Sequence, residues 1–218
     1  MFTGIVQRFC EVVAVEDLDG MRRHTVDLGE HAEGLELGAS VANNGTCLSV
    51  TKVDGGLVSF DVIAETLRLT NLDTVQVGDR INIERSMRLG DEIGGHEVSG
   101  HVSTVGIVAE IERSENNQRT WIEVEERWMP YLHHKGFVAL DGASLTISHL
   151  DPDRRRFAVS LIPETLERTT FGHHDVGDRV NLEVENRTQV IVDTITRMLS
   201  DPDTLARLGI TPPPTSAS

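Results

Sequence analysis

The feature that most constrains the fold of this 218-residue chain is an internal repeat. Residues 63–84 read IAETLRLTNLDTVQVGDRINIE and residues 162–183 read IPETLERTTFGHHDVGDRVNLE, so the two segments align without a gap. Further upstream, VANNGTCLSVT at 41–51 aligns with VALDGASLTIS at 138–148. Self-similarity of this kind indicates one structural unit that is present twice.

The repeat reaches the start of the chain, because FTGIVQ at 2–7 aligns with VSGHVS at 98–103. We therefore predict a first domain over residues 1–97 and a second over residues 98–187. Short runs of alternating apolar and polar residues, such as 120–126 after the turn residues SENNQ, are typical of β-strands. About six such strands fit each half. Closure into a barrel removes exposed strand edges, so the expected fold class is all-β, with two tandem six-stranded antiparallel β-barrels of the Greek-key type.

The end of the chain has a different pattern. From residue 188 onward Ile191, Ile195, Met198 and Leu199 recur at helical spacing, which predicts an amphipathic C-terminal α-helix within residues 188–210. A second short helical segment is expected between Ser200-Asp201-Pro202, which supplies a cap, and Gly209. Residues 211–218 are expected to be disordered. The apolar stripe must either cover its own domain or meet another chain.

The composition excludes several classes of function. The chain has 20 Lys and Arg against 35 Asp and Glu, a net charge of -15, so nucleic acid is not an expected partner. Two cysteines are too few for a disulfide framework or a zinc site of paired cysteines. The sequence contains neither a signal-peptide pattern nor a long apolar run. We expect a soluble, cytoplasmic protein with no membrane partner.

Cys47 and Ser144 are candidate functional residues because they occupy the same place in the two halves. Each follows a turn sequence, and each is followed two residues later by a hydroxyl, Ser49 or Thr146. These groups can hydrogen-bond a heterocycle, although a free cysteine is more often a small buried hydrophobic residue, and hydroxyls often bond the backbone. The chain shows no sign of a hydrolase, because it has no Gly-x-Ser-x-Gly motif and Ser144 lacks the context of a nucleophile elbow.

His101 is a further candidate, since it lies in the glycine-rich segment GGHEVSGHVS, which also holds His96. A histidine there can exchange protons near neutral pH, and a solvated linker histidine is the alternative. His101 replaces Ile5 of the first half, which suggests that the two barrels do different jobs. Thr66 and Thr165, in the repeated ETL turns, are expected either to cap a short helix or to bind ligand.

The adjacent histidines His133-His134 and His173-His174 do not indicate a metal site. Neighbouring residues rarely converge on one ion, and solvated loops explain both pairs. Lys135 is a better candidate, because it precedes the strand that leads to Ser144.

The motifs MFTGIVQ, NGTCLSV, ETLRLTNL, DEIGGHEVSGH, KGFVALDGASLT and LIPETLERTT follow one another along nearly the whole chain. In this order they resemble the riboflavin synthase family. The resemblance implies dismutation of two molecules of 6,7-dimethyl-8-ribityllumazine by four-carbon transfer, giving riboflavin and 5-amino-6-(ribitylamino)pyrimidinedione. It implies no cofactor and no metal, a homotrimer gathered by the C-terminal helix, and a site between the N-terminal barrel of one subunit and the C-terminal barrel of its neighbour.

The resemblance also implies two substrate-binding pockets. The first would be lined by Phe2, Gly4, Ile5, Val6, Ser40, Cys47, Leu48, Ser49, Asp61, Val62, Ile63, Ala64, Glu65 and Thr66. The second would be lined by Gly100, His101, Val102, Lys135, Ser144, Leu145, Thr146, Ser160, Leu161, Ile162, Pro163, Glu164 and Thr165. Catalysis is expected from His101 with Ser144 and Thr146 on the donor side, and from Cys47 with Ser40 on the acceptor side. The chain departs from the family's usual CLTV motif at Ser49, which keeps the hydroxyl but lacks the methyl group of threonine.

Two other classes remain as alternatives. Lumazine proteins share this kind of fold and bind the lumazine or a flavin without turnover, but the SGH and ETL motifs that they lose are intact here. A flavin reductase would need a nicotinamide-binding domain with a glycine-rich strand-to-helix turn, and the sequence contains no such motif.

Overall fold

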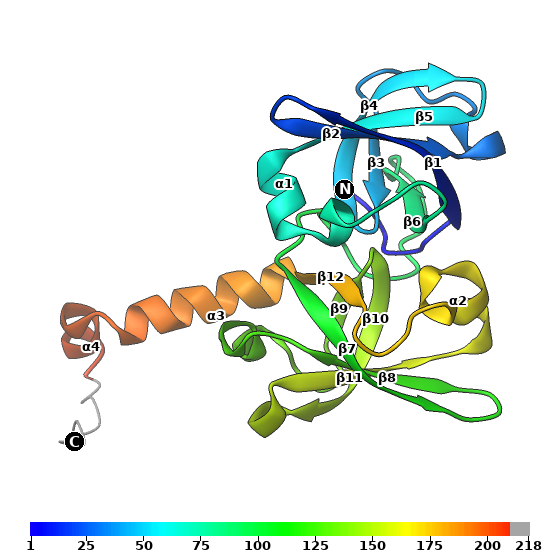
Figure 1. Ribbon diagram of the computed structural model, residues 1–218. Helices are drawn as coiled ribbons and strands as arrows, with labels where there is room; N and C mark the ends of the chain where they lie inside the picture. Colours follow the sequence, from blue (N-terminus) through cyan, green and yellow to red (C-terminus); the bar gives the residue numbers. More distant parts are fainter. Residues whose placement is uncertain (210–218) are drawn as a thin grey trace. The chain divides into compact units, whose positions relative to one another are not determined.

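The structure is a computed structural model that describes residues 1–209, and it contains two closed antiparallel barrels of six strands each (Figure 1). The predicted fold class of duplicated β-barrels followed by a helix is confirmed. The chain divides into residues 1–185, which hold both barrels, and a C-terminal segment that begins at Asn186. The predicted disordered tail, 211–218, lies outside the described residues.

The strands occupy equivalent places in the two barrels. The first barrel is formed by β1 (Arg8–Leu18), β2 (Met21–Asp27), β3 (Ser40–Asn43), β4 (Thr46–Asp54), β5 (Leu57–Ile63) and β6 (Arg80–Arg85), which pair around the ring in the order β1-β2-β5-β4-β3-β6. The second is formed by β7 (Thr104–Arg113), β8 (Gln118–Glu123), β9 (Phe137–Leu140), β10 (Ala143–Asp151), β11 (Arg156–Leu161) and β12 (Arg179–Val184), in the matching order β7-β8-β11-β10-β9-β12.

Short helices fill the connections. The ETL segments form α1 (Ala64–Leu69) and α2 (Pro163–Arg168), and single 3-10 turns cover Gly29–Ala32, Asn71–Asp73, Glu126–Tyr131, Pro152–Arg154 and Thr170–Gly172. Thr66 and Thr165 do not cap these helices, because the cap positions are Ile63 and Ile162. Instead, their carbonyls accept hydrogen bonds from Thr70 Oγ1 at 2.8 Å and Thr169 Oγ1 at 2.6 Å. The capping prediction for the two ETL threonines is therefore wrong.

The alternation of strand side chains decides which predicted residues face a core. In β4, Leu48 and Val50 point into the first barrel, and Cys47 and Ser49 point outward. The equivalent residues of β10 follow the same rule, with Leu145 and Ile147 inside the second barrel. The candidate hydroxyls and the thiol therefore lie on the outer surfaces of the barrels.

The two barrels meet through a pseudo-symmetric polar network. The side chain of Asn82 accepts from the N–H of Thr170 and donates to the carbonyl of Asp141, and its counterpart Asn181 accepts from the N–H of Asn71 and donates to the carbonyl of Asn44. These groups are buried and hydrogen-bonded, so the two barrels pack together as one compact unit.

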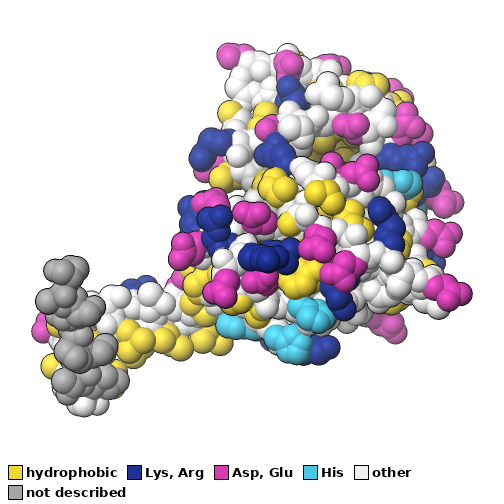
Figure 2. Space-filling view, turned by 60° about the horizontal axis from the view of Figure 1, so that its bottom comes forward, with side chains coloured by type: hydrophobic (Ala, Val, Ile, Leu, Met, Phe, Trp, Pro, Cys, Tyr) yellow, Lys and Arg dark blue, Asp and Glu magenta, His cyan; other side chains and the backbone are white. Residues whose placement is uncertain are grey.

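The C-terminal segment contains α3 (Asn186–Leu199) and α4 (Pro202–Leu208). The side chain of Asp201 caps α4 by accepting the N–H of Asp203, and Gly209 ends the helix in the left-handed conformation. Hydrophobic side chains gather along this segment (Figure 2), among them the exposed Ile191, Ile195 and Met198. None of the described helices is both long enough and apolar enough to span a membrane.

Candidate active site

The segment that begins each half of the chain packs against the barrel of the other half. The carbonyl of Gly4 accepts the N–H of Ser144 at 2.7 Å, and the carbonyl of Gly100 accepts the N–H of Cys47 at 2.9 Å. Residues 4–6 therefore lie against the second barrel, and Gly100 lies against the first. This corrects the predicted membership of the pockets, in which residues 4–6 joined Cys47 and residues 100–102 joined Ser144. The repeat shows which residues are equivalent, but it does not show which barrel each segment touches.

Glycine is required at both crossing points. Gly4 has φ +72°, and a Cβ there would lie 2.5 Å from the Ser144 Cβ. Gly100 has φ +84°, and a Cβ there would lie 2.6 Å from the Cys47 Cβ. A side chain would therefore be strained and would overlap the residue on which the segment lies.

The second-barrel site is a small open cavity of about 200 Å³. Its rim includes Ile5 and Ile162, which are 48% and 55% exposed, and its floor includes Ser144. Exposed aliphatic side chains beside a few polar groups suit a flat heterocycle. The lining residues are Gly4, Ile5, Val6, Ala143, Ser144, Leu145, Ile162, Glu164, Thr165, Arg168 and Thr169.

His96 is a neighbour of Ser144 that the sequence reasoning did not select. Its Nδ1 lies 2.6 Å from the Ser144 Oγ, and its ring stacks on Phe137 with centroids 5.3 Å apart. Burial lowers the pKa of His96, so the ring is held neutral and can accept the proton of the serine hydroxyl. The contact joins residues 48 positions apart, so no local motif indicates it.

The first-barrel site is built on the outer face of β3, β4 and β5. Ser40 pairs with Ser49 across β3 and β4, next to Cys47. Asp61 is held by two hydrogen bonds from Arg23, at 2.7 and 2.9 Å, and the hydrogen bond from Arg23 lowers the pKa of Asp61. The carboxylate is therefore fixed in place on β5 by its pair with Arg23.

The backbone next to His101 bonds Cys47 and not Ser144. Its neighbour Gly100 bonds Cys47, and its own N–H donates to the Ser99 Oγ at 3.1 Å. The predicted grouping of His101 with Ser144 and Thr146 in one pocket is therefore wrong for a single chain. Lys135 takes the left-handed conformation, with φ +68°, and its N–H donates to the carbonyl of Ile147 in β10, so it is placed on the second barrel.

Several predicted binding residues have no exposed side chain. Val62 and Leu161 point into the barrel cores, as Leu48 does, because they occupy inward positions of the strand alternation. Phe2 is fully buried between the barrels, where it packs with Ala42, Val98 and Ala139. These buried side chains pack beneath the surfaces on which the two predicted sites lie. The predicted residues that remain on the surface near the two sites are Ile63, Ala64, Glu65, Thr66, Val102, Ser160, Pro163, Glu164 and Thr165.

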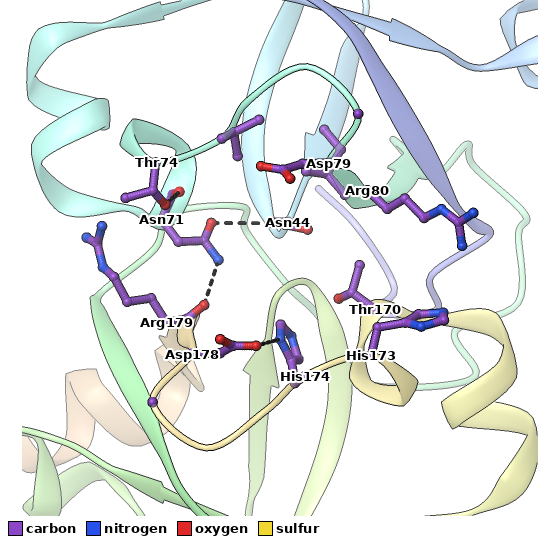
Figure 3. Close-up of a pocket in the computed structure, with 14 residues that line it drawn as sticks. Asn44, Asn71, Thr74, Asp79, Arg80, Thr170, His173, His174, Asp178 and Arg179 are labelled. Carbon is purple, nitrogen blue, oxygen red and sulfur yellow. Dashed lines mark hydrogen bonds and ion pairs between the residues drawn. The ribbon is translucent and has the colours of Figure 1, made fainter.

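A larger cavity, about 800 Å³, lies between the barrels and is lined by the Gly-Asp-Arg segments 78–80 and 177–179 (Figure 3). His174 and Asp178 point toward one another there, and His174 also bonds the buried Asp141. His174 is therefore paired and half-buried, which corrects its assignment to a solvated loop. Residues 1–209 contain no group of three or more His, Cys, Asp or Glu side chains that could hold a metal ion. None of the chemically reactive residues of the two sites lines this cavity.

Comparison with known proteins places the chain in a family. The lumazine binding domain family matches residues 3–86 and again residues 99–185. The riboflavin synthase of Escherichia coli (strain K12) is 50% identical over 202 residues, which cover 92% of this chain and 94% of that protein. The riboflavin synthase of Chlamydia trachomatis is 42% identical over 200 residues, 90% of this chain and 96% of that protein. The chain belongs to the riboflavin synthase family.

Membership of the riboflavin synthase family makes the chain an enzyme of riboflavin biosynthesis. Solved structures of LumP share its fold. LumP complexed with riboflavin superposes with a TM-score of 0.80 at 23% identity, and LumP complexed with 6,7-dimethyl-8-(1'-D-ribityl) lumazine with a TM-score of 0.77 at 22% identity. Each covers 85% of this chain and 100% of the LumP chain.

Proposed function

We propose that this chain catalyses the dismutation of two molecules of 6,7-dimethyl-8-ribityllumazine to riboflavin and 5-amino-6-(ribitylamino)pyrimidinedione. The observation that carries the proposal is the 50% identity to a riboflavin synthase along 92% of the chain. The duplicated outer sites, one on each barrel, agree with a reaction that consumes two copies of one substrate. No cofactor takes part in the proposed reaction.

The reaction needs the two lumazine rings to lie against each other. We propose that the site of one barrel faces the opposite barrel's site of a neighbouring subunit, within a homotrimer that the C-terminal helix gathers. The open cavity on the second barrel and its exposed isoleucine rim support this arrangement, because a second protein surface would cover them. Holding both rings in one orientation replaces an encounter in solution by a reaction within a complex. The proposed compartment is the cytoplasm.

The proposed catalytic groups are divided between the two sites. On the first barrel, Cys47 with Ser40 and His101 would activate one ring and exchange its protons. On the second barrel, Ser144 with Thr146 would hold the other ring, and neutral His96 would orient the Ser144 hydroxyl by accepting its hydrogen bond. The proton removed first is that of the acidic methyl group at C7 of one lumazine.

The test is incubation of the purified protein with 6,7-dimethyl-8-ribityllumazine alone. We expect riboflavin to appear with a stoichiometry of one riboflavin for two lumazines consumed, measured by absorbance and chromatography, without any added cofactor. Tight fluorescent binding with no riboflavin would instead establish a lumazine-protein type of function and contradict the proposed reaction.

A further inference from the structure

Two buried carboxylates have no part in the proposed chemistry. Glu84 in β6 is 4% exposed, and Glu183 in β12 is 6% exposed. They are equivalent residues of the two repeats. Within residues 1–209 neither carboxylate has a cation at ion-pair distance, and burial raises the pKa of both groups. A buried carboxylate without a counter-charge is unfavourable unless hydrogen bonds compensate for the lost water.

The compensating hydrogen bonds come from the exchanged segments. Glu84 Oε1 accepts the N–H and the Oγ1–H of Thr3 at 2.6 and 2.8 Å, and Oε2 accepts the N–H of Gly4 at 3.1 Å. Glu183 repeats the arrangement, because Oε1 accepts the N–H of Ser99 at 2.7 Å and Oε2 accepts the N–H of Gly100 at 3.0 Å. Each carboxylate therefore holds two successive backbone N–H groups with its two oxygens.

These contacts connect each carboxylate to the site of the other barrel. Glu84 belongs to the first barrel, but Gly4, which it holds, bonds Ser144 of the second barrel. Glu183 belongs to the second barrel, but Gly100, which it holds, bonds Cys47 of the first.

We propose that Glu84 and Glu183 are crosswise positioning residues. Each sets the backbone of the segment that forms one wall of the substrate site on the opposite barrel. The proposal rests on the proposed function, since it assumes that the two outer sites bind lumazine. Substitution by glutamine tests it, because a carboxylate offers two acceptor oxygens and an amide offers one. The amide NH₂ would face a backbone N–H, so one of the two backbone hydrogen bonds is lost at nearly constant volume.

The experiment measures the occupancy of the first-barrel site and the total occupancy of both sites in the full-length protein, so the second-barrel site follows by difference. Cys47 is half-exposed and Cys10 is buried, so the rate of Cys47 alkylation by iodoacetamide reports ligand at the first-barrel site. Equilibrium dialysis with 6,7-dimethyl-8-ribityllumazine reports binding at both sites together. For Glu183→Gln we expect the lumazine concentration that half-protects Cys47 to rise about tenfold, because the substitution removes one charge-assisted hydrogen bond. For Glu84→Gln we expect that midpoint to stay unchanged, while dialysis shows that the other site has weakened to a similar extent.

Matched controls separate positioning from general loss of stability. Val12→Ala and Val108→Ala remove equivalent core methyl groups from β1 and β7, and they should lower the melting temperature without shifting the Cys47 midpoint. Thr3→Val keeps the carboxylate and its two backbone bonds, and it removes the hydroxyl that donates to Glu84 and accepts the N–H of Ile5. It should therefore weaken the second-barrel site in the same direction but by less. This variant remains informative if Glu84→Gln does not fold.

The outcomes distinguish the two proposals. Wild-type protein that binds no lumazine contradicts the proposed function. Wild-type protein that binds two lumazines, with each glutamine variant weakening its own barrel's site or both sites equally, contradicts the crosswise role.

Discussion

His24 gives the most direct test of the energetics of the first barrel. It lies in β2, is 0% exposed, and neither ring nitrogen has a hydrogen-bond partner within residues 1–209. Burial lowers the pKa of His24 from 6.5 to about 4. The folded chain therefore keeps the ring neutral while the unfolded chain takes up a proton below pH 6.5, so stability is lost as the pH falls from 6.5 toward 4. Linkage at 1.36 kcal/mol per pKa unit gives a loss of about 2 kcal/mol by pH 5 and about 3 kcal/mol by pH 4.

The perturbation is His24→Leu, which replaces the ring by an apolar side chain of similar volume. Urea unfolding is monitored by far-ultraviolet circular dichroism at one protein concentration. As the pH is lowered from 7.5 to 5, we expect the free energy of unfolding of the variant to rise by about 2 kcal/mol relative to that of wild type. His133→Leu is the control, because it removes an exposed histidine of the second barrel and should retain the loss of stability that His24 causes at low pH. Parallel curves for wild type and His24→Leu would refute the assignment of a neutral, unpaired histidine.

Three further predictions follow from individual contacts. Gly100→Ala should weaken lumazine binding at the first site at least tenfold, because the added Cβ is strained at φ +84° and overlaps Cys47; isothermal titration calorimetry checks this. Iodoacetamide at pH 8 should modify one thiol per folded chain, at Cys47, since burial raises the pKa of Cys10 to about 11; peptide mass spectrometry that finds Cys10 modified equally would contradict this. His174→Gln should reduce stability by about 1 kcal/mol more at pH 6 than at pH 9. Burial lowers the pKa of His174, but its bonds to Asp141 and Asp178 outweigh burial and raise the pKa overall. The stabilisation that His174 provides is therefore complete below pH 6.5 and is lost as the pH rises through the raised pKa. Thermal denaturation at the two pH values measures the difference.

The barrels and their strand alternation could be predicted from the sequence because they depend on local patterns. The duplicated segments imply matching strands, and a period of two residues places Leu48 and Val50 inside and Cys47 outside. The caps of α4 follow from Asp201 and Gly209 for the same reason, since each acts on residues a few positions away.

The composition of the two sites could not be predicted in this way. An alignment of repeats stays the same whether residues 4–6 return to their own barrel or cross to the other, so it contains no information on the exchange. The bond between Gly4 and Ser144 joins positions 140 residues apart in the chain, and the contact of His96 with Ser144 joins two different elements. Such contacts depend on how the barrels pack, not on the local sequence.

The exchange explains how one chain can treat two copies of the same substrate differently. The backbone of the two sites is nearly the same, because in each a glycine with positive φ bonds the strand after a turn and is held by a buried glutamate. That shared frame suits the binding of one heterocycle twice. The side chains on the frame differ, because the residue after the crossing glycine is His101 in one site and Ile5 in the other, and the strand residues are Cys47 and Ser144. Because each site takes one wall from the other half, both repeats contribute groups to both sites. A dismutation requires two sites that bind the same molecule but react with it differently, one as donor and one as acceptor.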